Sequence, residues 1–505
     1  MRAGRREDPM ASQSQGLERN AIGLTEVLFQ SITHMAPAVA VALSIGFATS
    51  LAGGITPLAV LLAMIAVLFT AYGIGELARH LPSAGGMYTY VGRGLGSYAG
   101  WLMAWAFLLA EPIVPPVLFA AFGFYGAALV TELTGFSNDL LWLPIAVLSA
   151  GIVWYLTYRG ISFSTRTGVV LGLIEISIFL FVSVLLVLNA DNTLSVFIPG
   201  DAGIQPALQG MVFCLLAFVG FEAAAPLAEE TRDPKRTIRQ AVLWSAILIG
   251  LFYVFSYYAA TVYFGPANMA DFISANEGNP WGGMASEVLP GIGSLLVVFA
   301  ILNSCLANAN SGANASTRAI FSLGRSRLLP AAFGSVHPTH RTPATAVHFQ
   351  GILGIVIAVA LSLWLASSYP ETPGPLNTYF VLGYALGLLF AGMYIAVNVA
   401  VIGFYLRERR DEFNIVKHVV VPVVGVILMI PAFISTIGGV TIPIIDLELS
   451  ALTAPYSYAP LFVAAWMVVG IVIGLYLWTS RREAIGRVGQ AMGETESDMA
   501  GEASA

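Results

Sequence analysis

Three glutamates stand in otherwise apolar stretches of the sequence and are the first candidates for chemistry. They are Glu111, Glu175 and Glu222, and no Lys or Arg lies in the same stretch as any of them. In a hydrocarbon layer an ionised, unpaired carboxylate costs roughly 2.5–3.5 kcal/mol. We therefore expect each to be protonated, paired or turned toward a wet cavity, where it could exchange a proton or hold a cation.

Two of these acids have several chemical interpretations from the residues alone. Glu175 could exchange a proton, hold a sodium ion with Asn303 or Ser304, or only hydrogen-bond to polar neighbours. Glu111 precedes a proline, so it could contact a cationic substrate or merely stabilise a helix kink. The sequence leaves these alternatives open.

Two apolar stretches carry a break near their middle. In the first, Pro37 lacks an N–H and clashes with the carbonyl four residues back, and it stands between Ala36 and Ala38. In the second, Gly220 lies two residues before Glu222, and a proline follows the acid by four residues. Either feature alone could be a kink or a packing glycine. Together they favour a pair of discontinuous membrane helices.

Main-chain groups at such breaks can bind a solute. Free N–H groups carry about half a positive charge and suit a carboxylate, while free carbonyls suit an amine. No Lys or Arg is expected in any apolar stretch, so we expect the backbone to bind the carboxylate of an amino acid. The sequence predicts carboxylate capture at Ala36, Pro37 and Ala38, amine contacts at Ile32, Thr33, Phe218 and Val219, and lining side chains from His34, Met35, Phe218 and Phe221 around Gly220.

Charge is sorted along the chain in the manner of a membrane protein. All 23 Lys and Arg residues can be placed in alternate connections, and the connections between them carry only acids. By the positive-inside rule the basic segments, including both termini, face the cytoplasm. A hydrophobic fraction of 57%, a charged fraction of 10% and a mean hydropathy of +0.79 exclude a large water-soluble core. The basic segments are 2–19, 79–93, 159–166, 232–239, 318–341, 407–417 and 481–487.

These seven segments require twelve spans, which predicts an all-α membrane protein with twelve transmembrane helices. Spans 1 and 6 run in opposite directions and both are discontinuous, so we expect a five-plus-five inverted repeat. The expected spans are 24–51, 57–78, 97–130, 140–158, 167–190, 207–228, 240–264, 289–315, 344–367, 377–403, 419–437 and 455–480. The expected units are a cytoplasmic tail (1–20), the first repeat (21–190), the inverted second repeat (206–403), helices 11 and 12 (419–480) and a cytoplasmic tail (481–505).

Other classes of protein are disfavoured. The charge is segregated by side, which implies no nucleic-acid partner, and Cys214 and Cys305 read as buried thiols. Apart from His34 and a borderline His348, no histidine is expected inside the membrane. We therefore expect no enzyme activity, no cofactor and no metal site. Membrane lipid is an expected partner, the cell membrane is the expected location, and oligomeric state is open.

Three motifs resemble those of the amino acid–polyamine–organocation superfamily of permeases. They are residues 76–96 (ELARHLPSAGGMYTYVGRGLG), residues 218–237 (FVGFEAAAPLAEETRDPKRT) and the segment from Asn310 to Pro343. The resemblance covers about residues 20–480 and implies the five-plus-five fold. It further implies that Glu222 matches an acid that some relatives use in proton-linked movement, although a structural hydrogen bond is the alternative. Glu175 stands where some proton-coupled relatives carry a lysine.

The resulting expectation is a secondary active transporter that moves a small amino acid by alternating access, coupled to protons or else to sodium. A permease or exchanger for polyamines or small organic amines is the alternative. The chain has Ala36-Pro37-Ala38 where many relatives have a glycine-rich sequence, so substrate identity does not carry over. A membrane solute-sensing receptor is the non-transport alternative, and it would bind a solute without accumulating it.

If Glu175 is the coupling group, Glu175→Gln should flatten the pH dependence of uptake into proteoliposomes, because the amide cannot exchange a proton. An unchanged pH profile in a folded variant would remove Glu175 from the coupling mechanism.

Overall fold

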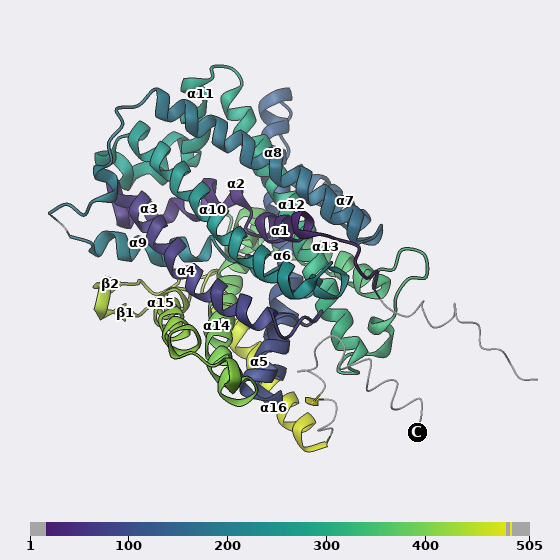
Figure 1. Cartoon of the computed structure of the whole chain (residues 1–505). Coiled ribbons are helices and arrows are strands. Elements are labelled where there is room, and N and C mark those ends of the chain that lie inside the picture. Colours follow the sequence, from purple (N-terminus) through teal and green to yellow (C-terminus); the bar gives the residue numbers. More distant parts are fainter. Residues whose placement is uncertain (1–16, 202, 481–484, 487–505) are drawn as a thin grey trace, which may run out of the picture.

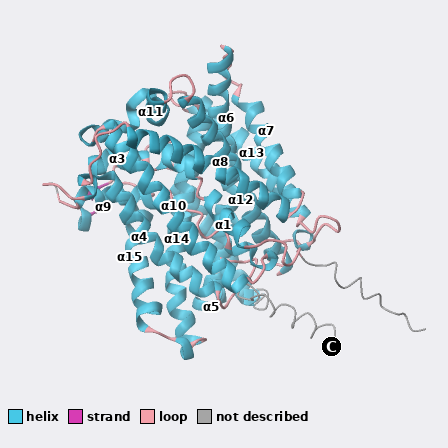
Figure 2. Cartoon of the chain, turned by 45° about the horizontal axis from the view of Figure 1, so that its top comes forward, coloured by secondary structure: helices cyan, strands magenta, loops and turns pink. Residues whose placement is uncertain are grey.

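The described part of the chain is almost entirely helical. The computed structural model describes residues 17–201, 203–480 and 485–486, and Figures 1 and 2 show them as a packed bundle of helices with one two-stranded hairpin at its edge. The helices are α1 (Leu24–His34), α2 (Pro37–Val39), α3 (Gly46–Ala52), α4 (Thr56–Ala78), α5 (Met87–Leu95), α6 (Ser97–Thr134), α7 (Trp142–Tyr158), α8 (Ile161–Leu188), α9 (Gln205–Leu216), α10 (Pro234–Phe264), α11 (Pro280–Val288), α12 (Gly293–Arg325), α13 (Ala344–Ser368), α14 (Gly374–Arg407), α15 (Val421–Ser435) and α16 (Tyr458–Ser480).

Shorter elements complete the chain. The antiparallel strands are β1 (Thr441–Ile442) and β2 (Leu447–Glu448). Turns of 3-10 helix lie at Gly53–Ile55, Ser195–Phe197, Ala225–Glu230, Pro266–Gly278, Ala331–Gly334, Arg410–Glu412 and Pro443–Ile445, and π-helical turns lie at Ala40–Ser44 and Val416–Val420.

The helices have the length and surface of membrane spans. In the described residues ten helices are long and apolar enough to cross a membrane, and α7 and α9 are shorter apolar helices in the places of the fourth and sixth expected spans. Large apolar side chains are exposed on the outside while the three glutamates are buried, which is the arrangement that a hydrocarbon solvent favours. The exposed side chains include Leu148, Val170, Phe181, Ile352 and Val472.

The first predicted break is present. Helix α1 ends at His34, and Ala36 adopts the left-handed conformation with φ 46° and ψ 63°. Pro37 then starts the second half of the helix, which runs through α2 and the π-helical turn to α3 at Ala52. Proline fits the first position of a helix because its missing N–H has no intrahelical role there. The sequence thus ends one helix and begins the next within three residues.

The second predicted break is also present. Helix α9 ends at Leu216, and residues 217–224 form successive turns before the 3-10 turn at Ala225–Glu230. Gly220 has a φ of 118°, which side chains rarely adopt. Hydrogen bonds between residues three apart, such as Ala223 N–H to the Gly220 carbonyl, replace the α-helical pattern. The glycine is therefore what lets the chain unwind here.

Helix α6 stays one element despite three prolines in its interior. Pro116 has no N–H for the carbonyl of Pro112, and the side chain of Gln350 on α13 donates to that carbonyl instead at 3.0 Å. A neighbouring helix thus supplies the hydrogen bond that proline removes, as spans in lipid require.

One prediction about the charged residues is wrong. We expected every Lys and Arg to lie in a connection, but α12 continues to Arg325, so Arg318 lies inside a candidate span and is fully buried. It is tolerated because Glu230 accepts two hydrogen bonds from its guanidinium, at 2.9 and 3.2 Å. A bidentate pair of this kind compensates the charge that burial would otherwise leave bare.

Two further ion-pair groups lie at the same end of the bundle, which we call the basic end. Arg325 donates to both carboxylate oxygens of Glu229, at 2.9 and 2.6 Å. Burial alone would raise the pKa of Glu229, but Arg325 outweighs burial and holds that pKa below its usual range. Glu76 accepts from Arg79 and Arg239, at 2.9 Å each. These pairs link the ends of α4, α10 and α12 at the basic end.

Removing one partner of the buried pair should be costly. We expect Glu230→Ala to lower the free energy of unfolding by about 3–5 kcal/mol, because Arg318 is left charged and unpaired in an apolar surrounding. Denaturant unfolding in detergent micelles measures the change. Glu408→Ala, which breaks the half-exposed pair with Arg93, is the matched control and should cost about 0–1 kcal/mol. Equal costs for the two variants would contradict this account.

Candidate functional site

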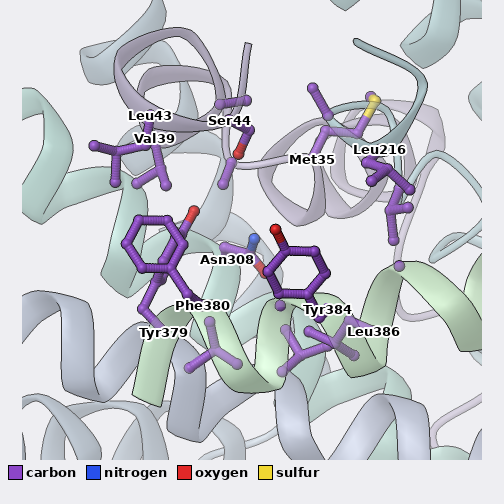
Figure 3. Close-up of a pocket in the computed structure, with 18 of the residues that line it drawn as sticks. Met35, Val39, Leu43, Ser44, Leu216, Asn308, Tyr379, Phe380, Tyr384 and Leu386 are labelled. Atoms are coloured by element: carbon purple, nitrogen blue, oxygen red, sulfur yellow. The ribbon is translucent and has the colours of Figure 1, made fainter. Parts of the chain in front are cut away.

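A cavity of about 240 Å³ lies where the two helix breaks meet α6 and α14. Figure 3 shows Tyr379, Phe380 and Tyr384 rising from α14 toward the segment that carries Val39, Leu43 and Ser44. The cavity extends from the breaks toward the end of the bundle opposite the basic end. Its lining is mostly apolar, and its polar members are His34, Ser44, Asn308, Tyr379, Tyr384, Ser435 and Thr436.

The cavity brings together some of the predicted site residues and leaves others behind it. His34, Met35, Ala36 and Val219 line it. The remaining predicted contacts are buried and pack around the breaks without lining the cavity; they are Ile32, Thr33, Pro37, Ala38, Phe218, Gly220 and Phe221. The two breaks are adjacent in space, since a Cβ on Gly220 would lie 2.6 Å from the His34 ring.

His34, Glu111 and Glu222 form a buried cluster beside the cavity. One candidate ligand atom from each lies within 4.8 Å of the others. His34 Nε2 lies 3.8 Å from a Glu111 oxygen, and His34 Nδ1 lies 3.2 Å from Ser311 Oγ. Neither oxygen of Glu111 has a hydrogen-bond partner in the described structure, and one oxygen of Glu222 is also unpartnered. The cluster could hold protons, an ammonium group or a metal ion.

Glu222 has defined partners for its other oxygen. That oxygen accepts a hydrogen bond of 2.5 Å from the Tyr394 hydroxyl and one of 3.1 Å from the Gly220 N–H. The carboxylate therefore caps the unwound segment that carries it. Tyr394 belongs to α14, the helix that also supplies the tyrosines of the cavity.

Glu175 makes the corresponding contact at the first break. Its Oε2 accepts from the Ala38 N–H at 3.1 Å, and Ser304 Oγ lies 3.4 Å from the Val39 nitrogen. Ser304 and Glu175 thus contact neighbouring N–H groups at the first break. Asn303 points elsewhere, because its amide donates to the Leu171 carbonyl at 2.6 Å.

Two tyrosines of α10 hold the broken ends. The Tyr253 hydroxyl lies 3.0 Å from the Met35 carbonyl and 3.1 Å from the Ala217 carbonyl, so its single hydrogen can be donated to the residue that follows either broken helix. The Tyr257 hydroxyl donates to the Val41 carbonyl at 2.8 Å. Carbonyls at a helix end lack intrahelical partners, and a hydroxyl is a suitable donor for them.

Several cavity residues were not among the main predicted site residues. Asn308 belongs to a polar run on α12 that also includes Asn310, Ser311 and Asn314, whose side chains bond to α1 and α8. Asn308 Oδ1 instead has no partner in the described structure, and this residue lines the cavity. The density of asparagines was a usable signal. Ser435 and Thr436 of the α15 end gave none, since they lie outside the expected repeat.

A larger cavity of about 880 Å³ lies between α6, α14 and α16 but is a weaker candidate for a polar solute. Ser457 is the only residue in its lining with a polar side chain among the described residues. A groove of this composition offers no group that could orient an ammonium or a carboxylate.

The long apolar helices, the two breaks and the buried acids define a multi-pass membrane transport protein. Comparison with known sequences gives the family. A family model described as amino acid permease matches residues 26–484, and the chain belongs to this family, within the amino acid–polyamine–organocation superfamily.

Curated relatives agree with the family. The chain is 27% identical over 409 residues to the low-affinity putrescine importer PlaP of Escherichia coli K12, covering 78% of this chain and 83% of the relative. It is 25% identical to the branched-chain amino acid permease BcaP of Bacillus subtilis, covering 75% and 80%. It is 24% identical to the serine/threonine exchanger SteT of the same organism, covering 66% and 73%. These relatives are transporters and not enzymes.

Because the two breaks are in close contact at Gly220, a larger residue there should destabilise the protein. We expect Gly220→Ala to cost at least about 1–3 kcal/mol, because the added Cβ would meet His34 and the backbone conformation is strained for any other residue. It should also abolish solute uptake. Gly151→Ala on α7 is the control, since a Cβ there meets nothing within 4 Å, and it should be neutral or stabilise the helix by up to about 1 kcal/mol. A stable, active Gly220→Ala protein would show that the breaks need not touch.

Proposed function

We propose that this protein is a secondary active transporter that carries a small, amine-bearing organic solute across the cell membrane by alternating access, driven by protons. The observation that carries the proposal is the cavity at two adjacent helix breaks, with unpaired buried acids beside it. Paired discontinuous helices at mid-membrane are the arrangement by which such transporters bind solutes. A receptor would hold the same solute without accumulating it.

The proposed architecture is twelve spans, with the repeats at 21–190 and 206–403 inverted relative to each other and helices 11 and 12 outside them. Two features support it. Each break lies in the first span of its unit. At each break a glutamate accepts a hydrogen bond from a main-chain N–H group, of Ala38 in the first unit and of Gly220 in the second. The long helices α6 and α12 hold equivalent positions in the two units and pack against each other. We place both termini and the basic end in the cytoplasm.

Alternating access then follows from where the closed contacts lie. The cavity reaches toward the outer end of α3 and α14, while ion pairs at Glu76, Glu229 and Glu230 close the basic end. Opening the cytoplasmic side requires at least the pairs with partly exposed arginines, Arg239–Glu76 and Arg325–Glu229, to separate. Solute binding that favours the open arrangement of these pairs would drive the cycle.

The solute needs a protonated amine. Putrescine, branched-chain amino acids, serine and threonine, which the names of the relatives give as their solutes, all carry one. In this chain the acids Glu111 and Glu222 offer unpartnered oxygens beside the cavity. An ammonium group there would compensate charge that burial otherwise leaves costly.

We assign proton coupling to the buried acids. Glu111, Glu175 and Glu222 each have at least one oxygen without a hydrogen-bond partner in the described structure, so each has room for a proton. His34 lies between the cavity and Glu111 and can pass a proton from one to the other. A sodium ion at Glu175 is a weaker proposal, because Asn303 is turned toward Leu171.

Purified protein in proteoliposomes should accumulate labelled amine or amino acid when the outside is made acidic. Glu222→Gln and Glu111→Gln should each lower this accumulation by about tenfold or more and flatten its pH dependence, because an amide cannot carry the coupled proton.

Glu132→Gln is the matched control, because Glu132 lies on α6 with Glu111 but is exposed. It should leave accumulation unchanged. Binding without any accumulation would contradict transport and favour the receptor interpretation. Full proton-driven accumulation in both test variants would place the coupling group elsewhere.

A further inference from the structure

Glu175 accepts the hydrogen bond of the Ala38 N–H, a main-chain donor that the carboxylate of a bound amino acid would need. We infer that Glu175 is a specificity-determining residue, an internal carboxylate standing in for that of an amino acid, so that the site takes amines that lack a carboxylate. The inference rests on the proposed function and names the substrate class of the same cavity. It replaces the expectation that Ala36, Pro37 and Ala38 bind an amino acid carboxylate.

The first step is to account for every N–H group at the first break. The Ala36 N–H donates to the Thr33 carbonyl, and Pro37 has none. The Ala38 N–H donates to Glu175 Oε2, and the Val39 nitrogen faces Ser304 Oγ. The next N–H, on Ala40, returns to the Ala36 carbonyl inside the helix. No N–H at this break is left for a carboxylate.

The N–H groups at the second break are engaged in a similar way, except that the Glu222 N–H has no acceptor in the described structure other than its own carboxylate. The Gly220 N–H donates to Glu222 Oε2, and the Ala224 N–H donates to Ser31 Oγ at 3.1 Å. The N–H groups of Phe221 and Ala223 bond within the unwound segment. At each break, therefore, a glutamate of this chain accepts a hydrogen bond from an N–H group that unwinding of the helix exposes.

Side chains provide no substitute. The cavity lining contains no Lys or Arg, and Arg318, the fully buried arginine of α12, is engaged with Glu230 and Thr317. A substrate carboxylate in the cavity would lie near the unpaired oxygens of Glu111 and Glu222 without a cation to compensate it. An ammonium group at the same place would instead be attracted by these oxygens and would compensate their charge.

The contact at Ala38 also explains how Glu175 could act on specificity without lining the cavity. Ala36, Val39 and Ala40 line the cavity on either side of Ala38, so the bonded N–H lies in the wall of the site. Glu175 reaches it from α8, behind that wall. Removing the carboxylate frees this donor while the lining side chains stay in place.

Pairs of solutes that differ only in the carboxylate test this directly. We would measure binding of putrescine against ornithine, isoamylamine against leucine and phenethylamine against phenylalanine, by calorimetry on the purified full-length protein. The wild-type protein should prefer the amine in at least one pair by about tenfold or more, the ratio expected when a carboxylate loses one charge-assisted hydrogen bond. Equal or tighter binding of the amino acid in every pair would overturn the inference.

Two substitutions separate a role in specificity from a structural one. Glu175→Ala frees the Ala38 N–H, so the preference for the amine should fall by about tenfold. Glu175→Gln keeps an oxygen acceptor for that N–H, so the preference should persist although the charge is gone. The same ratio in both variants would overturn the inference. Glu175→Ser replaces the alanine variant if that protein does not fold, and it is judged by the same ratio.

Accumulation assays with the same pairs distinguish failure of this inference from failure of the proposed function. Amine accumulation in proteoliposomes without accumulation of the matching amino acid supports both. Accumulation of the amino acids leaves the proposed function standing and overturns the role of Glu175. Accumulation of neither member of any pair overturns the proposed function and the inference with it.

Discussion

Every main-chain polar group in a membrane-embedded helix needs a partner from the protein itself, and the two breaks are where this requirement becomes demanding. Water cannot satisfy an exposed N–H or carbonyl in hydrocarbon, so a break persists only where side chains replace the lost helical bonds. The Tyr253 hydroxyl lies within hydrogen-bonding distance of the Met35 and Ala217 carbonyls, which follow the ends of the two broken helices. Glu175 and Glu222 serve N–H groups that follow the breaks. The residues around the candidate site therefore also supply the hydrogen bonds that the two helix breaks require.

The same physics divides the buried charges into two groups. At the basic end, Glu229 and Glu230 each meet an arginine in bidentate geometry, and these pairs tie α12 to the segment that follows the second break. At mid-membrane, Glu111 meets no basic residue other than the neutral-or-charged His34, and both of its oxygens lack hydrogen bonds in the described structure. A paired acid gains little from a proton or a solute amine. An unpaired buried acid is stabilised strongly by either one. For this reason we propose that protons and the solute amine bind at the mid-membrane acids.

Local signals predicted the spans and the breaks, because hydropathy, Pro37 and Gly220 act within a few residues of themselves. Contacts between distant helices could not be predicted in this way. The burial of Arg318 depends on Glu230, 88 residues away, so the rule that basic residues lie in connections was wrong there. Asn303 and Ser304 are neighbours in sequence, yet only Ser304 turns toward the first break, because they project from different faces of α12. The twelve-span count and the inverted repeat stay predictions.

Helix α12 alone reaches from the ion pairs of the basic end to the cavity at the helix breaks. Near one end it carries Arg318 and Arg325, which hold the ion pairs of the basic end. About two to five turns earlier it carries Ser311, bonded to Gln30 and His34 of α1, and Asn308 in the cavity lining. A helix of this length moves as a stiff rod, so a shift that separates the ion pairs must also disturb the contacts of α1 at the break. In the proposed transport cycle, a solute bound at the break would act on the basic end through this one helix, without a chain of intermediate contacts or a flexible loop.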